Sequence, residues 1–155
     1  MTVLATGELH TDLNAIKTMI AASSSFQAFT GAADAAAAAE YVHFHYVPAP
    51  QSAFALLYLD PGHTIELVDL DGYQTTPVVI VQFVAVSSKA DIGERLVDIE
   101  NTAGAVVADL QAAQGTGINP FIASIQPDSG PGVLPRETAQ HWVARSLKLT
   151  LSMRD

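Results

Sequence analysis

The first half of the chain contains side chains whose types and spacing could do chemistry. His43 and His45 stand two positions apart, which places both on one face of a strand, where they could bind zinc with Asp60 or His63 as a third donor. Two histidines in an aromatic segment are more often residues of a surface or of the edge of a core. The segment from Asp60 to His63 reads Asp-Pro-Gly-His and has the chemistry of a turn. The pattern favours a turn and strand residues over a metal site, which stays the alternative.

Other catalytic patterns are weaker still. Asp69 and Asp71 could do acid/base work if they were buried together, but beside Gly72 they are more typical of a solvated turn. Neither a GxGxxG nor a GxxxxGK[ST] phosphate loop occurs, and the Gly-x-Ser-x-Gly elbow of serine hydrolases is missing. The absence of cysteine excludes thiol nucleophiles and disulfides. We therefore expect no enzymatic activity and no cofactor.

Composition sets the class of protein. The 155 residues are 49% hydrophobic and 15% charged, which is enough to bury the core of one domain spanning residues 1–155. The net charge of −9 disfavours phosphate binding as the main activity. The longest apolar run, 78–86, is far shorter than the roughly 20 residues of a membrane-spanning helix, so no membrane association is expected.

Two main helices are expected from apolar residues at helical spacing. The first covers 6–22 and the second begins at Asp91 and ends near Gly115. The inner stripe of the first helix consists of Leu9, Leu13, Ile16 and Ile20. Ser23 to Ser25 break this pattern, and a short helix is predicted at 35–39, with Asp34 in the position of its N-cap.

Extended segments account for most of the remaining chain. Strands are predicted at 41–47, 54–59, 64–70, 78–86, 121–125 and 142–152, and Asp71-Gly72 is a hairpin signal. The 78–86 strand is apolar on both faces, as a central strand would be. Prolines and glycines between 127 and 135 predict an irregular loop. The expected fold is a single α+β domain with a mostly antiparallel sheet packed against two main helices.

Charge is distributed unevenly along the chain. No Lys or Arg occurs from Thr18 to Ser88, and the acids Asp60, Glu66, Asp69 and Asp71 gather around one hairpin. Four of the seven bases follow the Pro/Gly segment: Arg136, Arg145, Lys148 and Arg154. A molecule with one acidic and one basic part is suited to head-to-tail contact with copies of itself. A monomer with unremarkable loops is the alternative.

The order of these segments resembles that of the tail terminator, or tail-completion, proteins of long-tailed phages and phage-like particles. The likeness covers most of the chain. It includes the amphipathic segment 8–22, the linker Phe26-Gln-Ala-Phe29, an extended stretch ending at Pro48 to Pro50, the acidic hairpin within 54–86, the long helix after Asp91, the 127–135 segment and the final strand from His141.

This resemblance implies a structural virion protein of the tail, assembled in the cytoplasm of a bacterial host. Members of the family form a ring, commonly hexameric, that ends polymerisation of the tail tube protein and offers a surface to the head connector protein. Genomic DNA passes through such a ring without sequence-specific binding, and an acidic lumen would not hold its phosphates.

A ring of this kind requires a heterologous contact between copies. On the resemblance we place seven residues at that subunit interface: Glu66, Asp69 and Asp71 on one side, Arg136, Arg145 and Lys148 on the other, and Trp142 as an apolar contact. Two other functions stay open, another head-to-tail connector or neck protein and, in a different class, a small metal-dependent enzyme using His43 and His45.

Overall fold

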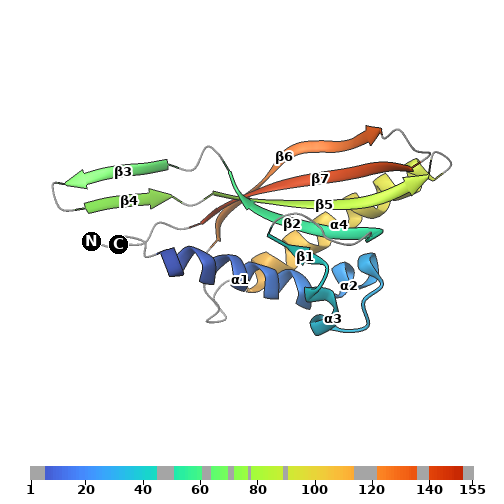
Figure 1. Ribbon diagram of the computed structural model, residues 1–155, viewed down its shortest axis with the longest axis horizontal. Helices are drawn as coiled ribbons and strands as arrows, with labels where there is room; N and C mark the ends of the chain where they lie inside the picture. Colours follow the sequence, from blue (N-terminus) through green and yellow to red (C-terminus); the bar gives the residue numbers. More distant parts are fainter. Residues whose placement is uncertain are drawn as a thin grey trace.

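The chain forms a five-stranded sheet with helices on one side and a separate two-stranded arm (Figure 1). The computed structural model describes residues 6–44, 51–60, 64–69, 72–76, 78–88, 91–113, 122–135 and 140–151. Its elements are α1 (Thr6–Ala22), α2 (Ser24–Thr30), α3 (Ala35–Ala39), β1 (Val42–His43), β2 (Ala53–Leu59), β3 (Thr64–Asp69), β4 (Gly72–Thr76), β5 (Val78–Ser88), α4 (Ile92–Ala113), β6 (Ile122–Pro135) and β7 (Gln140–Leu151). The expected α+β class is confirmed.

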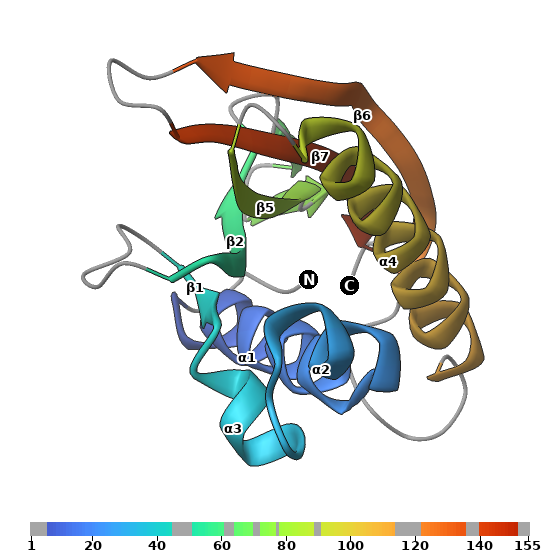
Figure 2. The same cartoon turned by 90° about the vertical axis from the view of Figure 1, so that its right-hand side faces the viewer.

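The main sheet has the order β1-β2-β5-β7-β6, and only the short β1–β2 pair is parallel. The predicted central strand is β5, which lies between β2 and β7. Figure 2 shows α1, α2 and α4 gathered on the concave side of this sheet. A sheet that is apolar on one face must bury that face, and the two long helices α1 and α4 supply the cover.

The core lies between the sheet and these helices. Ile16 and Ile20 of α1, with Val106 of α4, are fully buried against it. Phe83 of β5 contacts the ring of Phe26 at a centroid distance of 6.1 Å. Spacings of three and four residues place the helix side chains on one stripe, as the sequence predicts.

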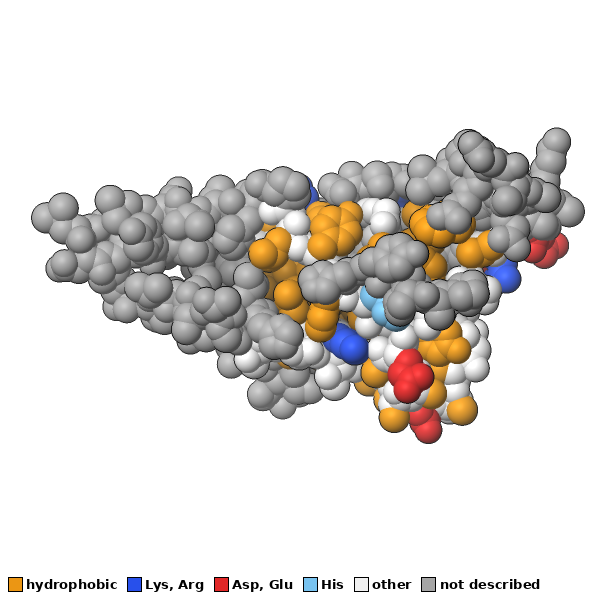
Figure 3. Space-filling view, in the orientation of Figure 1, with side chains coloured by type: hydrophobic (Ala, Val, Ile, Leu, Met, Phe, Trp, Pro, Cys, Tyr) orange, Lys and Arg blue, Asp and Glu red, His pale blue; other side chains and the backbone are white. Residues whose placement is uncertain are grey.

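A smaller apolar cluster lies on the opposite face of the sheet. Phe54, Val84 and Ala144 are buried there, with Leu56 and Trp142 partly buried beside them. Figure 3 shows hydrophobic side chains at the surface on this side of the molecule. Both faces of the main sheet therefore carry apolar clusters, as the two-sided hydrophobicity of β5 indicates.

The connection after α1 is shorter than expected. Ser23 alone interrupts the helices, and α2 begins at Ser24, so the expected break over three serines is wrong. The helix ends at Gly31, whose φ of 78° is left-handed backbone that glycine adopts without strain. The predicted N-cap of α3 is confirmed, since the carboxylate of Asp34 accepts a hydrogen bond of 2.8 Å from the N–H of Ala37.

The predicted irregular loop at 127–135 is wrong. Those residues belong to β6, which is paired along its length with β7 and has three register irregularities, between Ile122 and Ser124, Pro127 and Ser129, and Ser129 and Gly132. An edge strand needs hydrogen bonds on one side only, which makes proline tolerable. Bulges accommodate the residues that cannot pair. The strand predicted at 121–125 is thus the beginning of a longer one.

Among the described residues, no helix is both long enough and apolar enough to cross a bilayer.

Candidate subunit interface

The acidic hairpin of the sequence is a two-stranded arm. β3 and β4 form their own antiparallel ladder, with Glu66 opposite Gln74 and Asp69 opposite Gly72. Figure 1 shows the arm extending away from the main sheet at one end of the molecule. Asp71, the third predicted acid, lies outside the described residues.

The arm leaves the sheet between the end of β2 and the start of β5. There the N–H of Asp60 donates a hydrogen bond of 2.9 Å to the carbonyl of Val78, which continues the β2–β5 ladder by one position. The Asp60 carboxylate also lies 2.9 Å from the Lys148 ammonium of β7. Asp60 is 16% exposed and Lys148 37%, so water partly screens this ion pair, which links the end of β2, where the arm begins, to β7.

Arg145 and Lys148 of the predicted basic side lie on opposite faces of the sheet. The Arg145 guanidinium is 3.3 Å from the Glu100 carboxylate of α4, on the helix side, and is 14% exposed. Lys148 is paired with Asp60 on the other face. Both bases are thus engaged within their own subunit. Arg136 lies outside the described residues, and the interface assignment of the seven residues stays a prediction.

Trp142 packs on the face of the sheet away from α4. Its ring meets Phe54 edge-on, with centroids 6.2 Å apart and an interplanar angle of 83°. His43 approaches the same Phe54 ring at 6.2 Å. Trp142 is therefore packed within its own subunit and remains partly exposed at the surface.

The zinc hypothesis gains no support. The Nε2 atom of His43 is hydrogen-bonded to the side-chain oxygen of Gln51 at 2.7 Å. His45 and His63 lie outside the described residues. Among the side chains that are described, no group of three His, Asp or Glu residues could hold a metal ion.

A hollow that the sequence reasoning missed lies between α2 and α4. Its volume is about 330 Å³, and its walls include Ser25, Phe29, Arg95, Asp98, Asn101 and Thr102. Ser25 and Phe29 come from α2, and the other four residues come from successive turns of α4. In the sequence, the polar residues of α4 at spacings of three and four indicate a shared polar face on that helix. Only the packing of α2 against this face forms the hollow.

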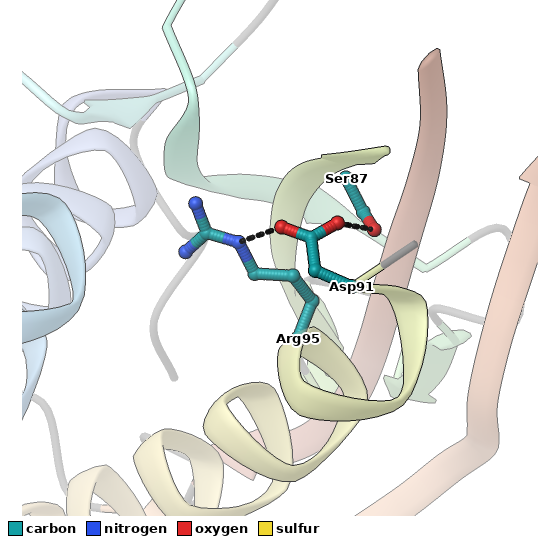
Figure 4. A network of polar contacts seen from close by, with 3 residues as sticks. All are labelled: Ser87, Asp91 and Arg95. Atoms are coloured by element: carbon teal, nitrogen blue, oxygen red, sulfur yellow. Dashed lines mark hydrogen bonds and ion pairs between the residues drawn. The ribbon is translucent and has the colours of Figure 1, made fainter. Parts of the chain in front are cut away.

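The start of α4 positions Arg95. Ser87 at the end of β5 donates a hydrogen bond of 2.9 Å to the Asp91 carboxylate, and the Arg95 Nε lies 4.0 Å from the other oxygen of that carboxylate. Figure 4 shows the two terminal nitrogens of the guanidinium pointing away from Asp91. Arg95 is 33% exposed, so its charge is held at the wall of the hollow but stays accessible.

Comparisons with known proteins found matches among solved structures alone. No family model matches the chain, and no curated protein matches it. One similar structure is a chain of the virion of a native gene transfer agent particle, with 12% identity, a TM-score of 0.44, and coverage of 90% of this chain and 92% of that one. Another, which carries no descriptive name, has 17% identity, a TM-score of 0.41, and coverage of 93% and 96%. Since both TM-scores are below 0.5, we base the functional proposal on the chain's own residues.

Proposed function

We propose that this protein is a structural component of a phage-like virion, which forms a ring at the head-proximal end of the tail tube. There it ends tube polymerisation and provides the surface for head joining. The proposal follows from the resemblance in segment order to tail terminator proteins, and the fold supports it through the β3–β4 arm.

The arm is the observation that carries the proposal. An isolated two-stranded hairpin is marginally stable in water and requires further strands or a packed face. Within the part of the chain that the structure describes, β3 and β4 pair with no strand of the main sheet. An acidic segment extended at one end of a subunit is suited to contact a neighbouring copy, and repeated heterologous contacts of this kind close into a ring.

Electron microscopy of the purified protein tests this function. Negative-stain images are expected to show rings with a central hole, and the protein is expected to bind the end of purified tail tubes. Binding to a head connector without binding to tubes would indicate a neck protein instead. A protein that stays monomeric at high concentration and binds neither partner would overturn the proposal.

Charge reversal tests the contribution of the arm. Asp69→Lys with Asp71→Lys should shift the particle mass from ring to monomer in mass photometry, because it replaces two negative charges by positive ones. The same two residues changed to Asn are the matched control for backbone and size, and should have a smaller effect. An unchanged oligomer after charge reversal would remove the electrostatic part of the proposal.

A further inference from the structure

We propose that the hollow between α2 and α4 receives a carboxylate from β3, Glu66 or Asp69, of a neighbouring copy. This inference rests on the proposed ring and identifies a receptor for the arm within it. It also replaces the predicted acceptors Arg145 and Lys148, which are paired within their own subunit.

Thr102 is the first observation behind this assignment. It is 6% exposed and lines the hollow, and among the described residues no hydrogen bond satisfies its hydroxyl. The other buried polar residues of the described chain, Asp12, Ser23, Ser87 and Ser146, all have partners. A buried hydroxyl without a partner loses the hydrogen bonds it would make to water, so a ligand that pairs with it gains affinity.

Arg95 is the second observation. Its Nε lies at 4.0 Å from Asp91, at the limit of an ion pair, and its terminal nitrogens point away from that carboxylate (Figure 4). A guanidinium presents its N–H groups as a planar fork that matches the two oxygens of a carboxylate. Arg95 therefore retains the donors needed for a second, bidentate anion.

Asp98 opposes this binding. Its carboxylate belongs to the same wall and would repel an incoming anion. The residue is exposed, however, so solvent and salt screen its charge. The donors of Arg95 and Thr102 act at contact distance, where their hydrogen bonds outweigh a screened charge. Removal of the Asp98 charge should consequently tighten the contact.

The positions of the two surfaces fit a head-to-tail arrangement. Figure 1 shows the arm at one end of the molecule, and α2 with the beginning of α4 toward the opposite end. A contact between unlike ends of successive copies is heterologous and can close into a ring. The arm is acidic and lies within a stretch without Lys or Arg, so an arginine is its natural partner.

The test compares isosteric variants of the full chain by mass photometry and sedimentation velocity. Arg95→Gln should weaken the association of subunits by about tenfold or more, and Glu66→Gln with Asp69→Asn should do the same. Asp98→Asn should strengthen it. Lys17→Gln removes the same charge from α1, where the Lys17 ammonium lies over the Phe44 ring and outside the walls of the hollow, and this matched control should change association less than about threefold.

A charge swap gives the strictest check. Arg95→Glu alone and Glu66→Lys with Asp69→Lys alone should each dissociate the ring, and the three changes together in one chain should restore it. Failure of the combined variant to assemble, or an unaltered ring after Arg95→Gln, overturns the inference while leaving the proposed function intact. Weaker association of Asp98→Asn with tighter association of Arg95→Gln shows a cationic occupant and also overturns it. A wild type without rings overturns the proposed function and this inference together.

Discussion

Arg145 and Lys148 lie three positions apart on β7 and yet serve opposite faces of the main sheet. Alternation along a strand assigns the faces, since Arg145 shares the parity of the buried Val143 and Lys148 does not. The partners, Glu100 of α4 and Asp60 at the end of β2, are distant in sequence. The two bases therefore form ion pairs that join β7 to α4 and to the end of β2 within one subunit.

The Arg145–Glu100 pair should contribute modestly to folding. In a double-mutant cycle with Arg145→Gln and Glu100→Gln, we expect a coupling free energy of about 0.5–1 kcal/mol, because Arg145 is largely buried but Glu100 is 42% exposed. Urea unfolding at low and high salt measures it, and the coupling should shrink in high salt. A coupling near zero at low salt would show that the pair contributes nothing to stability.

Trp142 should stabilise the subunit itself. Trp142→Ala removes an edge-to-face contact with Phe54 and part of the smaller apolar cluster. Since the side chain is only partly buried, we expect a loss of about 2 kcal/mol in the free energy of unfolding, and less for Trp142→Phe. Unfolding followed at concentrations where the protein is monomeric separates this effect from assembly. Unchanged monomer stability with lost assembly would make Trp142 an interface residue alone.

At the scale of elements, the arm and the main sheet are separable. The β2–β5 ladder continues to the Asp60–Val78 pair, so the hydrogen bonds between β2 and β5 do not depend on the arm that lies between these two residues in the sequence. The N–H of Asp60 donates to the Val78 carbonyl, so these two residues face each other as a hydrogen-bonded pair, the kind of pair that flanks a two-residue hairpin turn. We therefore expect the main sheet to form without the arm.

Excision of the arm tests this separation. Replacing 61–77 by Asn-Gly should leave the monomer folded, and the shorter loop should raise its unfolding free energy by up to roughly 2 kcal/mol. Ring formation should be lost. Circular dichroism with urea gives the first quantity, and mass photometry gives the second. Arm-free protein that still assembles into rings would contradict a role for β3 and β4 in the subunit contact.

At the scale of the whole molecule, the two ends differ in structure, and the net charge is −9. Unlike ends permit contacts between successive copies that repeat in one direction, and a net negative charge disfavours binding to the phosphates of duplex DNA. Both properties suit a ring through which DNA slides.

Duplex DNA should therefore not be retained. In a gel-retardation assay at about 0.15 M salt, we expect no shift of a duplex by the protein at micromolar concentration, because the counterion release that drives DNA binding needs clustered positive charge. A fragment with a changed sequence serves as the control for specificity. Retardation of both fragments would contradict an inert channel.

The sequence by itself determined the elements that depend on local periodicity and capping. The stripe of α1, the Asp34 cap, the long α4 and the central β5 follow from apolar spacing and from side chains that bond their own backbone. These interactions join residues that are only a few positions apart, so the local sequence is enough to predict them.

Tertiary structure alone decided the rest. The prolines and glycines of 127–135 indicate a loop when considered locally, but β7 provides a pairing partner and makes them an edge strand. The hollow at Arg95 and the internal partners of Arg145 and Lys148 likewise require α2, α4 and β2 to meet in space. Side chains brought together from distant segments leave no local pattern in the sequence, because their contacts form only when the core packs.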